Sequence, residues 1–348
     1  MKKKTIVTRT LIILIAGVFI YAYAIHPFLA NRPGVASTDN ADRQKPVGPA
    51  FDADSAWQFC AAQCAFGPRV MNSQAHEDCR QWIAGKFRQY GLGVTEQQAD
   101  VTGYDGTTLH ATNIIARYQP ALDQRIIVAA HWDSRPWADN DPDEANWHKP
   151  VMAANDGASG VAVMLELARL LAANADAAPA VGIDFICFDA EDWGTPQWSD
   201  LPDDPQSWAL GAQYWAANPT RAEGDGEQVQ PLYGILLDMV GGEGARFHQE
   251  QYSKLYAGNI VKKVWRAAEA VGKSSFFPKR DGGYITDDHV PMNQVARIPT
   301  IDIVPFHADC PQSSFGPTWH TTADTMDHID RNTLAAVGQT LVQVIYSE

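Results

Sequence analysis

The stretch of sequence that decides the fold runs from residue 183 to residue 192 and reads Ile-Asp-Phe-Ile-Cys-Phe-Asp-Ala-Glu-Asp. Residues 183–188 form a short, mainly apolar run rich in aromatic and β-branched side chains, which predicts a buried strand. Three carboxylates follow directly, at Asp189, Glu191 and Asp192. The stretch therefore predicts a sheet core together with an acidic edge of that sheet.

The flanking sequence alternates between strand and helix patterns. Expected strands cover 112–118, 125–130, 183–188, 234–240 and 298–304, and expected helices cover 73–90, 160–171, 208–217, 252–271 and 331–346. Ser73 and Asp330 are suitable N-caps for two of these helices. Helices alternating with apolar strands indicate an α/β protein, a three-layer sandwich whose central mixed, mostly parallel sheet is flanked by helices.

The N-terminus has the layout of an export segment. A basic stretch at 2–9 precedes an apolar run at 11–24 that ends in Ala-Tyr-Ala. This pattern predicts a signal peptide within residues 1–30, although the apolar character of residues 10–29 also fits an uncleaved inner-membrane anchor. On both interpretations the body is exported and periplasmic. Residues 31–50 are expected to be a linker, and 51–348 one domain.

Composition limits the partners and the cysteine chemistry. The net charge of the 348 residues is −14, and this acidity argues against nucleic-acid binding; membrane contact is expected only through the N-terminal segment. Of the five cysteines, Cys187 lies in an apolar strand and is expected in the core. Cys60, Cys64 and Cys79 are close enough in sequence to pair, and the sequence leaves their pairing open.

Ionisable side chains also follow the other expected strands. His131 ends one strand, Asp238 follows another, and His320 lies in the loop after the last; Asp156 opens a helix within Asn-Asp-Gly. Each residue alone has an ordinary explanation as a turn, a helix cap or a solvated strand end. Together they converge on the carboxyl edge of the sheet, where α/β proteins bind ligands. Oxygen and imidazole donors of this kind suit zinc.

The adjacent pair Glu191 and Asp192 is the most informative part of this edge. Neighbouring side chains at a strand end point in different directions, so both cannot bind one metal in the same way. One can ligate the metal while the other acts as a general base beside it.

These motifs resemble the zinc-dependent glutaminyl cyclases of animal type, which share their fold with the two-zinc aminopeptidases. The resemblance runs from residue 66 to the C-terminus. The motifs are His-Trp-Asp-Ser-Arg (131–135), Asn-Asp-Gly-Ala (155–158), Asp-Ala-Glu-Asp (189–192), Leu-Asp-Met-Val-Gly (237–241), Asp-Asp-His (287–289) and Trp-His-Thr (319–321).

The resemblance implies a role for each matching residue. It implies one zinc per chain, held by Asp156, Asp192 and His320; the animal enzymes have Glu where Asp192 stands. Glu191 falls on the general acid/base, with Asp238 and Asp287 as its supporting acids. The implied apolar pocket wall consists of Trp319, Phe315 and Ile285, with a further aromatic from Trp193 or Trp198. The implied reaction cyclises N-terminal glutamine of peptides and proteins to pyroglutamate and releases ammonia.

Two alternatives remain open. A two-zinc aminopeptidase uses the residue types that stand at His131, Asp156, Glu191, Asp192, Asp238 and His320. Asp287, where aminopeptidases commonly have Ser, the Trp before His320 and the Asp-Ser-Arg after His131 favour the cyclase. A membrane-tethered, non-catalytic binding ectodomain is the alternative from another class, and the complete ligand set disfavours it.

Two glycine-rich stretches, 241–244 and 280–283, lack the Lys-Ser/Thr and the strand-to-helix setting of a phosphate loop. They are expected to be turns bordering the site.

Overall fold

The computed structural model describes residues 45–202, 204–219 and 230–348. The expected export segment and most of the expected linker lie outside these residues. Within the described ranges, no helix has the length and apolar character needed to cross a membrane.

The described part of the chain contains a sheet of six strands in the order β1-β2-β4-β3-β5-β6. They are β1 (Gly93–Thr102), β2 (Thr108–Tyr118), β3 (Arg125–His131), β4 (Gly182–Phe188), β5 (Gly234–Leu237) and β6 (Thr300–Ile303). Strands β4, β3, β5 and β6 are parallel, whereas β2 runs antiparallel to both β1 and β4. The sheet is therefore mixed and mostly parallel, as the sequence predicts.

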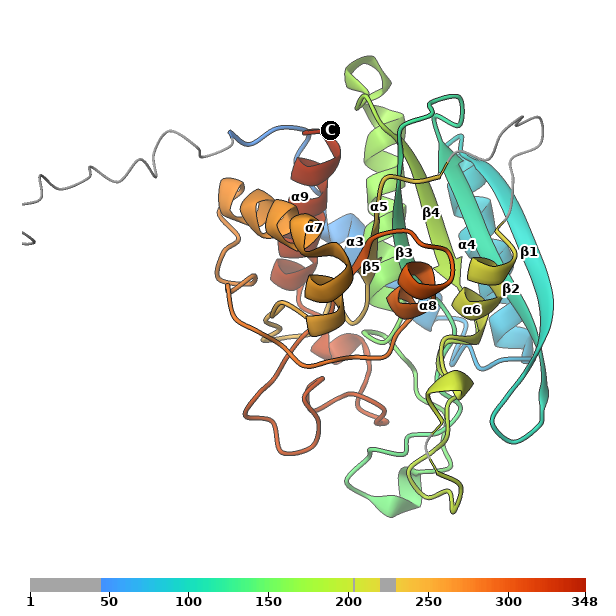
Figure 1. Cartoon of the computed structure of the whole chain (residues 1–348). Helices are drawn as coiled ribbons and strands as arrows, with labels where there is room; N and C mark the ends of the chain where they lie inside the picture. Colours follow the sequence, from blue (N-terminus) through green and yellow to red (C-terminus); the bar gives the residue numbers. More distant parts are fainter. Residues whose placement is uncertain (1–44, 203, 220–229) are drawn as a thin grey trace, which may run out of the picture. The chain divides into compact units, whose positions relative to one another are not determined.

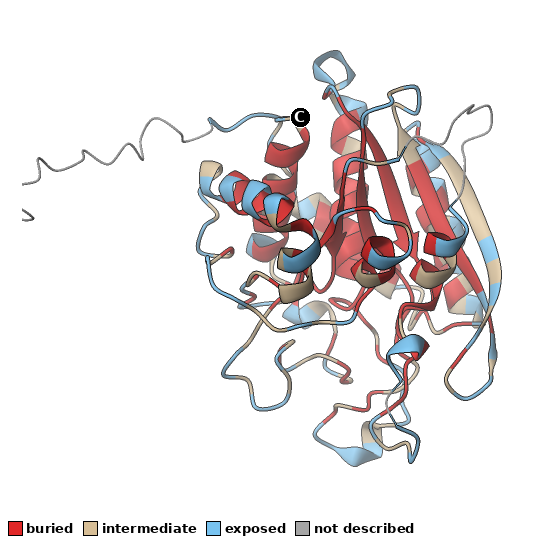
Figure 2. Ribbon diagram, in the orientation of Figure 1, coloured by how far each residue is buried: buried red, intermediate tan, exposed pale blue. Residues whose placement is uncertain are grey.

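Helices cover both faces of this sheet (Figure 1). They are α3 (Ala53–Cys64), α4 (Gln74–Gln89), α5 (Ala158–Ala173), α6 (Leu210–Ala217), α7 (Gln251–Ala270), α8 (His289–Gln294) and α9 (Arg331–Ile345). In β3, Ile126 and Val128 pack in the core cluster with α3, α4, α5, α7 and α9, whereas Ile127 and Ala129 pack with α6 and α8. Alternate residues of the strand thus contribute apolar side chains to opposite faces of the sheet. Figure 2 shows buried residues on the sheet and on the inner sides of the helices. The predicted three-layer sandwich is confirmed.

Local sequence signals explain where several elements begin. The Ser73 side chain accepts a hydrogen bond from the His76 N–H at 3.2 Å and caps α4. The Asp330 carboxylate accepts from the Asn332 N–H at 2.9 Å and caps α9. Both N-caps are confirmed.

The predicted strand 234–240 is shorter in the structure and ends at Leu237. Met239 has a φ of 49°, in the left-handed region, so the chain leaves the sheet directly after Asp238. All five cysteines are free thiols, and Cys187 is buried in the core as predicted.

Candidate active site

The parallel strands deliver ionisable side chains to one edge of the sheet. His131 is the last residue of β3, Asp238 directly follows β5, and Glu191 lies three residues beyond β4. A cavity of about 260 Å³ lies there. Its lining consists of Asp156, Glu191, Pro205, Trp208, Asp238, Met239, Tyr284, Ile285, Thr286, Asp287, Phe315, Trp319 and His320. The strand-exit residues singled out in the sequence therefore do converge.

The three predicted zinc ligands form a compact buried group. One ligand atom from each of Asp156, Asp192 and His320 lies within 4.8 Å of the other two. His320 Nε2 is 3.2 Å from Asp192 Oδ1 and 3.6 Å from Asp156 Oδ2. Asp192 Oδ2 is buried and has no hydrogen-bond partner within the described part of the chain. Because buried carboxylate oxygens require a compensating partner, this donor set fits a zinc ion.

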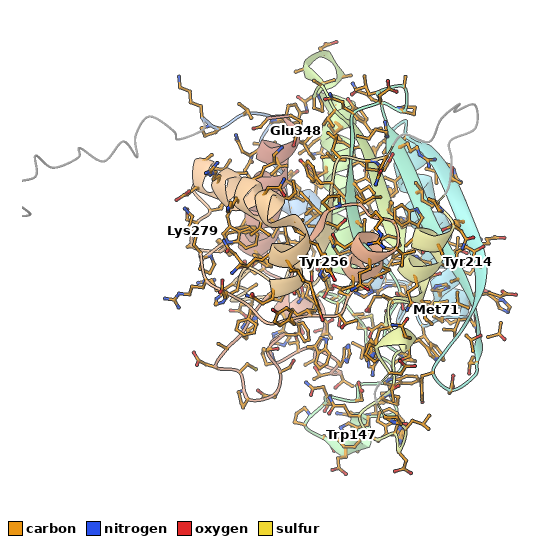
Figure 3. All side chains as sticks on the ribbon, viewed as in Figure 1. Met71, Trp147, Tyr214, Tyr256, Lys279 and Glu348 are labelled. Carbon is orange, nitrogen blue, oxygen red and sulfur yellow. The ribbon has the colours of Figure 1, made fainter. Side chains whose placement is uncertain are left out.

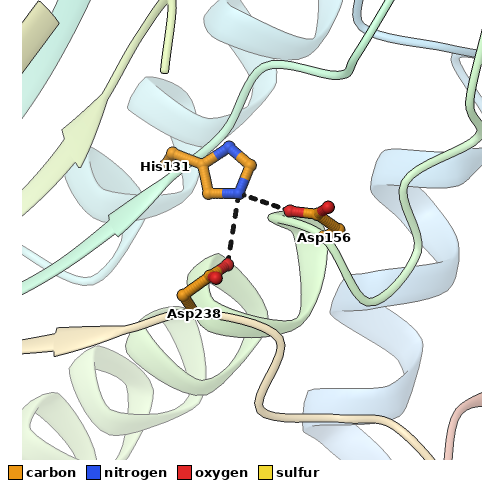
Figure 4. A group of neighbouring side chains, drawn as sticks. All are labelled: His131, Asp156 and Asp238. Atoms are coloured by element: carbon orange, nitrogen blue, oxygen red, sulfur yellow. Dashed lines mark hydrogen bonds and ion pairs between the residues drawn. The ribbon is translucent and has the colours of Figure 1, made fainter. Parts of the chain in front are cut away.

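A second group shares Asp156 with the first (Figure 4). His131 Nε2 lies 3.0 Å from Asp156 Oδ1 and 3.4 Å from Asp238 Oδ1, and its Nδ1 lies 3.4 Å from Asp133. Gly157 permits this approach, because a Cβ there would clash with the carbonyl oxygen and ring of His131. His131 therefore contacts Asp156, one of the three predicted zinc ligands.

Left-handed backbone turns aim the side chains of the site. Ala190 has a φ of 51° and His320 a φ of 54°, conformations that cost energy for residues with a Cβ and occur at functional sites. The turn at Ala190 separates the three carboxylates that follow β4. Asp189 points away from the cavity, since it binds the His76 ring at 2.8 Å and the Thr112 N–H at 2.6 Å. Asp189 therefore has a structural role, whereas Glu191 lines the cavity.

The acids predicted to act in catalysis are buried, and burial changes their ionisation. Burial, reinforced by the neighbouring charge of Asp192, raises the pKa of Glu191 well above its usual value. Burial likewise raises the pKa of Asp287. For Asp238 burial outweighs the hydrogen bond from His131 and raises the pKa to about 7. A carboxyl group whose pKa lies near 7, such as Asp238, can exchange a proton near neutral pH, which acid/base catalysis requires.

Further acids hold the ligand loops in place. Asp133 accepts hydrogen bonds from the backbone N–H groups of Glu191 at 3.1 Å and Asp192 at 3.2 Å. Asp324 accepts from the N–H groups of Asn155 at 2.8 Å and Asp156 at 3.1 Å. Asp133 belongs to a motif noted in the sequence, but its role did not follow from that motif. Asp324 had no sequence signal, because its partners lie about 170 positions away.

A buried ion pair between Arg135 and Asp139 contacts the Nδ1 side of the His320 ring. Arg135 binds both oxygens of Asp139 at 2.7 Å, and Asp139 Oδ1 lies 3.5 Å from His320 Nδ1. Arg135 also donates to the Asp192 backbone carbonyl at 3.1 Å. The pair thus contacts two of the three predicted ligands and fixes the imidazole orientation.

Three of the four predicted wall residues line the cavity: Phe315, Trp319 and Ile285. The Trp319 ring stacks on His320 with centroids 3.7 Å apart.

Trp193, the fourth, is not among the lining residues, and neither is its alternative Trp198. Trp193 packs edge-on against Trp137, with ring centroids 5.3 Å apart. Trp198 stacks on Trp147, which lies at the outer end of a loop (Figure 3). Trp208 supplies the further aromatic wall instead, its ring nearly parallel to that of His320 at 6.0 Å. The chain between Trp193 and Trp208 runs outward and returns, so the aromatic that reaches the cavity is the later one.

The chain belongs to peptidase family M28, whose model matches residues 113–345. Its sequence is 51% identical to that of Bacteroides thetaiotaomicron glutaminyl cyclase, whose crystal structure contains bound N-acetylhistamine. The two structures superpose with a TM-score of 0.82, and the match covers 87% of this chain and 100% of that one. This chain is 50% identical to a leucine aminopeptidase precursor from the same species, with a TM-score of 0.81, covering 87% and 99%. The family and fold expected from the sequence are confirmed.

Curated relatives include both kinds of enzyme. The aminopeptidase YwaD of Bacillus subtilis is 28% identical over 277 residues, and the glutaminyl-peptide cyclotransferase of Bos taurus is 25% identical over 245 residues. These matches cover 76% and 64% of this chain, and 50% and 62% of the relatives. The chain therefore spans about half to three fifths of the length of these relatives.

Proposed function

We propose that this protein is a zinc-dependent glutaminyl cyclase that converts N-terminal glutamine of peptides and proteins to pyroglutamate and releases ammonia. The observation that carries the proposal is a small cavity lined by the buried acids Asp156, Glu191 and Asp287 and by the aromatic rings of Trp208 and Trp319. Its volume of about 260 Å³ suits a single residue at the end of a peptide. The similarity to a glutaminyl cyclase over the full length of that chain supports the proposal.

The site residues divide the work of the reaction. Asp156, Asp192 and His320 would hold zinc, which when bound polarises the side-chain amide carbonyl of the substrate. Glu191 accepts a proton from the α-amine as its nitrogen bonds to the amide carbon. The same carboxyl group then donates the proton to the amide nitrogen, which leaves as ammonia when the old C–N bond breaks.

The surroundings of Glu191 suit this proton transfer. Asp287 contributes negative charge that helps raise the pKa of Glu191. Because water does not take part in cyclisation, apolar walls at Ile285, Phe315 and Trp319 assist by excluding it.

We further propose that the active enzyme holds one zinc per chain. His131 is already hydrogen-bonded to Asp156 at 3.0 Å, which occupies the position between the two residues. In the other group, Asp192 Oδ2 has no hydrogen-bond partner among the described residues. This carboxylate oxygen supports a zinc ion at the group of Asp156, Asp192 and His320.

A two-zinc aminopeptidase is the second candidate. The group of His131, Asp156 and Asp238 favours it, since one ligand atom from each lies within 4.8 Å of the others. Such an enzyme would hydrolyse the first peptide bond and release a free amino acid, whereas the cyclase leaves that bond intact.

Glu191→Gln tests the proposed cyclase. Removing the proton acceptor should lower ammonia release from a Gln-initiated dipeptide at least about 100-fold. Zinc content and thermal stability should stay unchanged, because Glu191 is not among the proposed ligands. The exposed Glu144, replaced by Gln, is the matched control and should retain full activity.

The competing outcomes are distinct in this assay. Wild-type release of free amino acids from several dipeptides, without ammonia from Gln-initiated ones, would establish the aminopeptidase and defeat the cyclase. Full ammonia release by Glu191→Gln would remove the proposed role of that residue.

We also propose that the body is exported to the periplasm, on the strength of the basic and apolar pattern in residues 1–30. Recovery of the protein after osmotic shock would support a cleaved signal, and recovery with the inner membrane an anchor. Recovery in the cytoplasm would contradict both.

A further inference from the structure

Tyr284 lies at the mouth of the cavity and is 69% exposed although it lines the site. Other lining residues such as Asp156, Ile285 and Asp287 are buried or half-buried. A large aromatic side chain left open beside a binding cavity offers apolar contact area to whatever crosses the mouth.

The backbone on both sides of Tyr284 is fixed. The Gln251 N–H donates to the Gly283 carbonyl at 2.9 Å, and the Ile285 N–H donates to Glu250 Oε1 at 3.2 Å. Glu250 is buried and is itself held at the start of α7, where its carboxylate accepts from the Tyr252 N–H at 2.7 Å. The turn at 280–283, which the sequence placed at the border of the site, therefore anchors Tyr284 at the mouth.

The ring of Tyr284 is supported on one side. Tyr252 contacts it edge-on at 5.0 Å, and Tyr252 in turn stacks on Tyr256 at 6.1 Å, on α7 (Figure 3). Because Tyr284 stays 69% exposed despite this contact, most of its ring remains accessible. A side chain ordered before binding loses little entropy when it makes a contact.

The size of the cavity indicates what meets this ring. About 260 Å³ holds the first residue of a peptide, whose amide must reach the buried lining residue Glu191. The rest of the peptide must leave across the mouth, where Tyr284, Pro205 and Thr286 are the exposed lining residues. The second residue is therefore the part of the substrate that passes Tyr284.

We propose that Tyr284 is a specificity-determining residue that contacts the side chain of the second substrate residue and favours aromatic and large apolar residues there. This inference rests on the proposed cyclase function. An acidic second residue is disfavoured, because Asp156, Glu191 and Asp287 lie behind the mouth and the whole chain carries a net charge of −14.

The test compares kcat/KM for Gln-Phe, Gln-Ala and Gln-Glu amides in the zinc-loaded full chain. Wild-type protein should prefer Gln-Phe to Gln-Ala by about fivefold to tenfold, the worth of one aromatic contact. Gln-Glu should be the poorest substrate. Tyr284→Ala should reduce the Gln-Phe preference to within about twofold of unity, chiefly by lowering kcat/KM for Gln-Phe.

Two further variants make the test specific. Tyr284→Phe keeps the ring and should keep the preference. Leu255→Ala removes an exposed apolar side chain that is outside the cavity lining, and it should also keep the preference.

An unchanged Gln-Phe preference in Tyr284→Ala, or the same loss in Leu255→Ala, would overturn the inference and leave the proposed cyclase function intact. Absence of ammonia from all three wild-type assays would overturn the cyclase proposal and this inference with it.

Discussion

Trp208 and Trp193 both follow β4, but their side chains have different surroundings. Trp208 lines the cavity and stacks on the Arg135 guanidinium at 4.7 Å, whereas Trp193 packs against Gly103 and Trp137. Trp208→Ala should therefore raise KM for a Gln dipeptide about tenfold. Trp193→Ala should leave KM near the wild-type value and lower the free energy of unfolding by about 1–3 kcal/mol.

Steady-state kinetics and urea unfolding of the two variants check this pair of expectations. A larger rise in KM for Trp193→Ala than for Trp208→Ala would contradict the assignment of Trp208 to the wall.

For single residues, the sequence predicts the location of side chains that lie at or just after the end of a strand. Glu191, Asp238 and His131 are of this kind, because parallel strands of one sheet end at the same edge. Trp208 could not be predicted in this way, since the path of the loop before it depends on tertiary contacts. Asp324 was equally hidden, because its effect on Asp156 depends on chain segments that meet only in the folded protein.

Asp141 joins two loops of the site. One of its oxygens accepts from Asn146 Nδ2 at 2.9 Å, and the other accepts from the Thr322 N–H at 3.0 Å, two residues after His320. Burial opposes ionisation, but the hydrogen bonds from Thr322 and Asn146 outweigh it and lower the pKa of Asp141 from 3.8 to about 2. A carboxyl whose pKa is lower in the folded state stabilises the fold above pH 4 and loses that contribution as pH falls towards 2.

The fold should therefore lose about 1 kcal/mol from Asp141 between pH 6 and pH 3. In Asp141→Asn the free energy of unfolding should be lower at pH 6 and should fall less steeply with acid, by this amount. Urea unfolding at pH 6, 4 and 3 measures the difference, with the exposed Asp309→Asn as control. Equal pH dependence in wild type and Asp141→Asn would contradict the expectation.

Most elements with a clear apolar pattern were predictable, including the four-residue strands β5 and β6, whereas polar or Pro-containing ones were not. The sequence predicts α4, α5, α7 and α9 to within about two residues, because their apolar spacing and caps act locally. Strand β1 escaped prediction, since its sequence is polar and its pairing partner is the edge of β2. Helix α8 escaped as well, because its six residues include Pro291, which disfavours a helix on sequence grounds.

For the whole molecule, part of the negative charge is concentrated in the candidate active site. The net charge is −14, and five of the carboxylates are buried around one cavity: Asp156, Glu191, Asp192, Asp238 and Asp287. Burying several carboxylates together is unfavourable unless a cation or protons compensate them. A cation bound at this point therefore stabilises the folded state.

Zinc binding should consequently stabilise the native state. A ligand that binds only the folded protein adds about 2.7 kcal/mol at a free concentration of 100 Kd, which raises the Tm of a domain of this size by roughly 5 °C. Chelator treatment should lower Tm, and added zinc should restore it. Asp192→Ala should abolish the zinc-dependent rise because it removes a proposed ligand, whereas Asp238→Ala should retain it because Asp238 is not one.

Metal analysis of the same samples decides between one and two ions. One zinc per chain is expected in wild type and in Asp238→Ala, and none in Asp192→Ala. Two zincs per wild-type chain, or loss of the Tm rise in Asp238→Ala, would instead place a metal at the group of His131, Asp156 and Asp238. The two groups share Asp156, so only variants at their unshared members can separate them. For that reason the test substitutes Asp192 and Asp238 rather than Asp156.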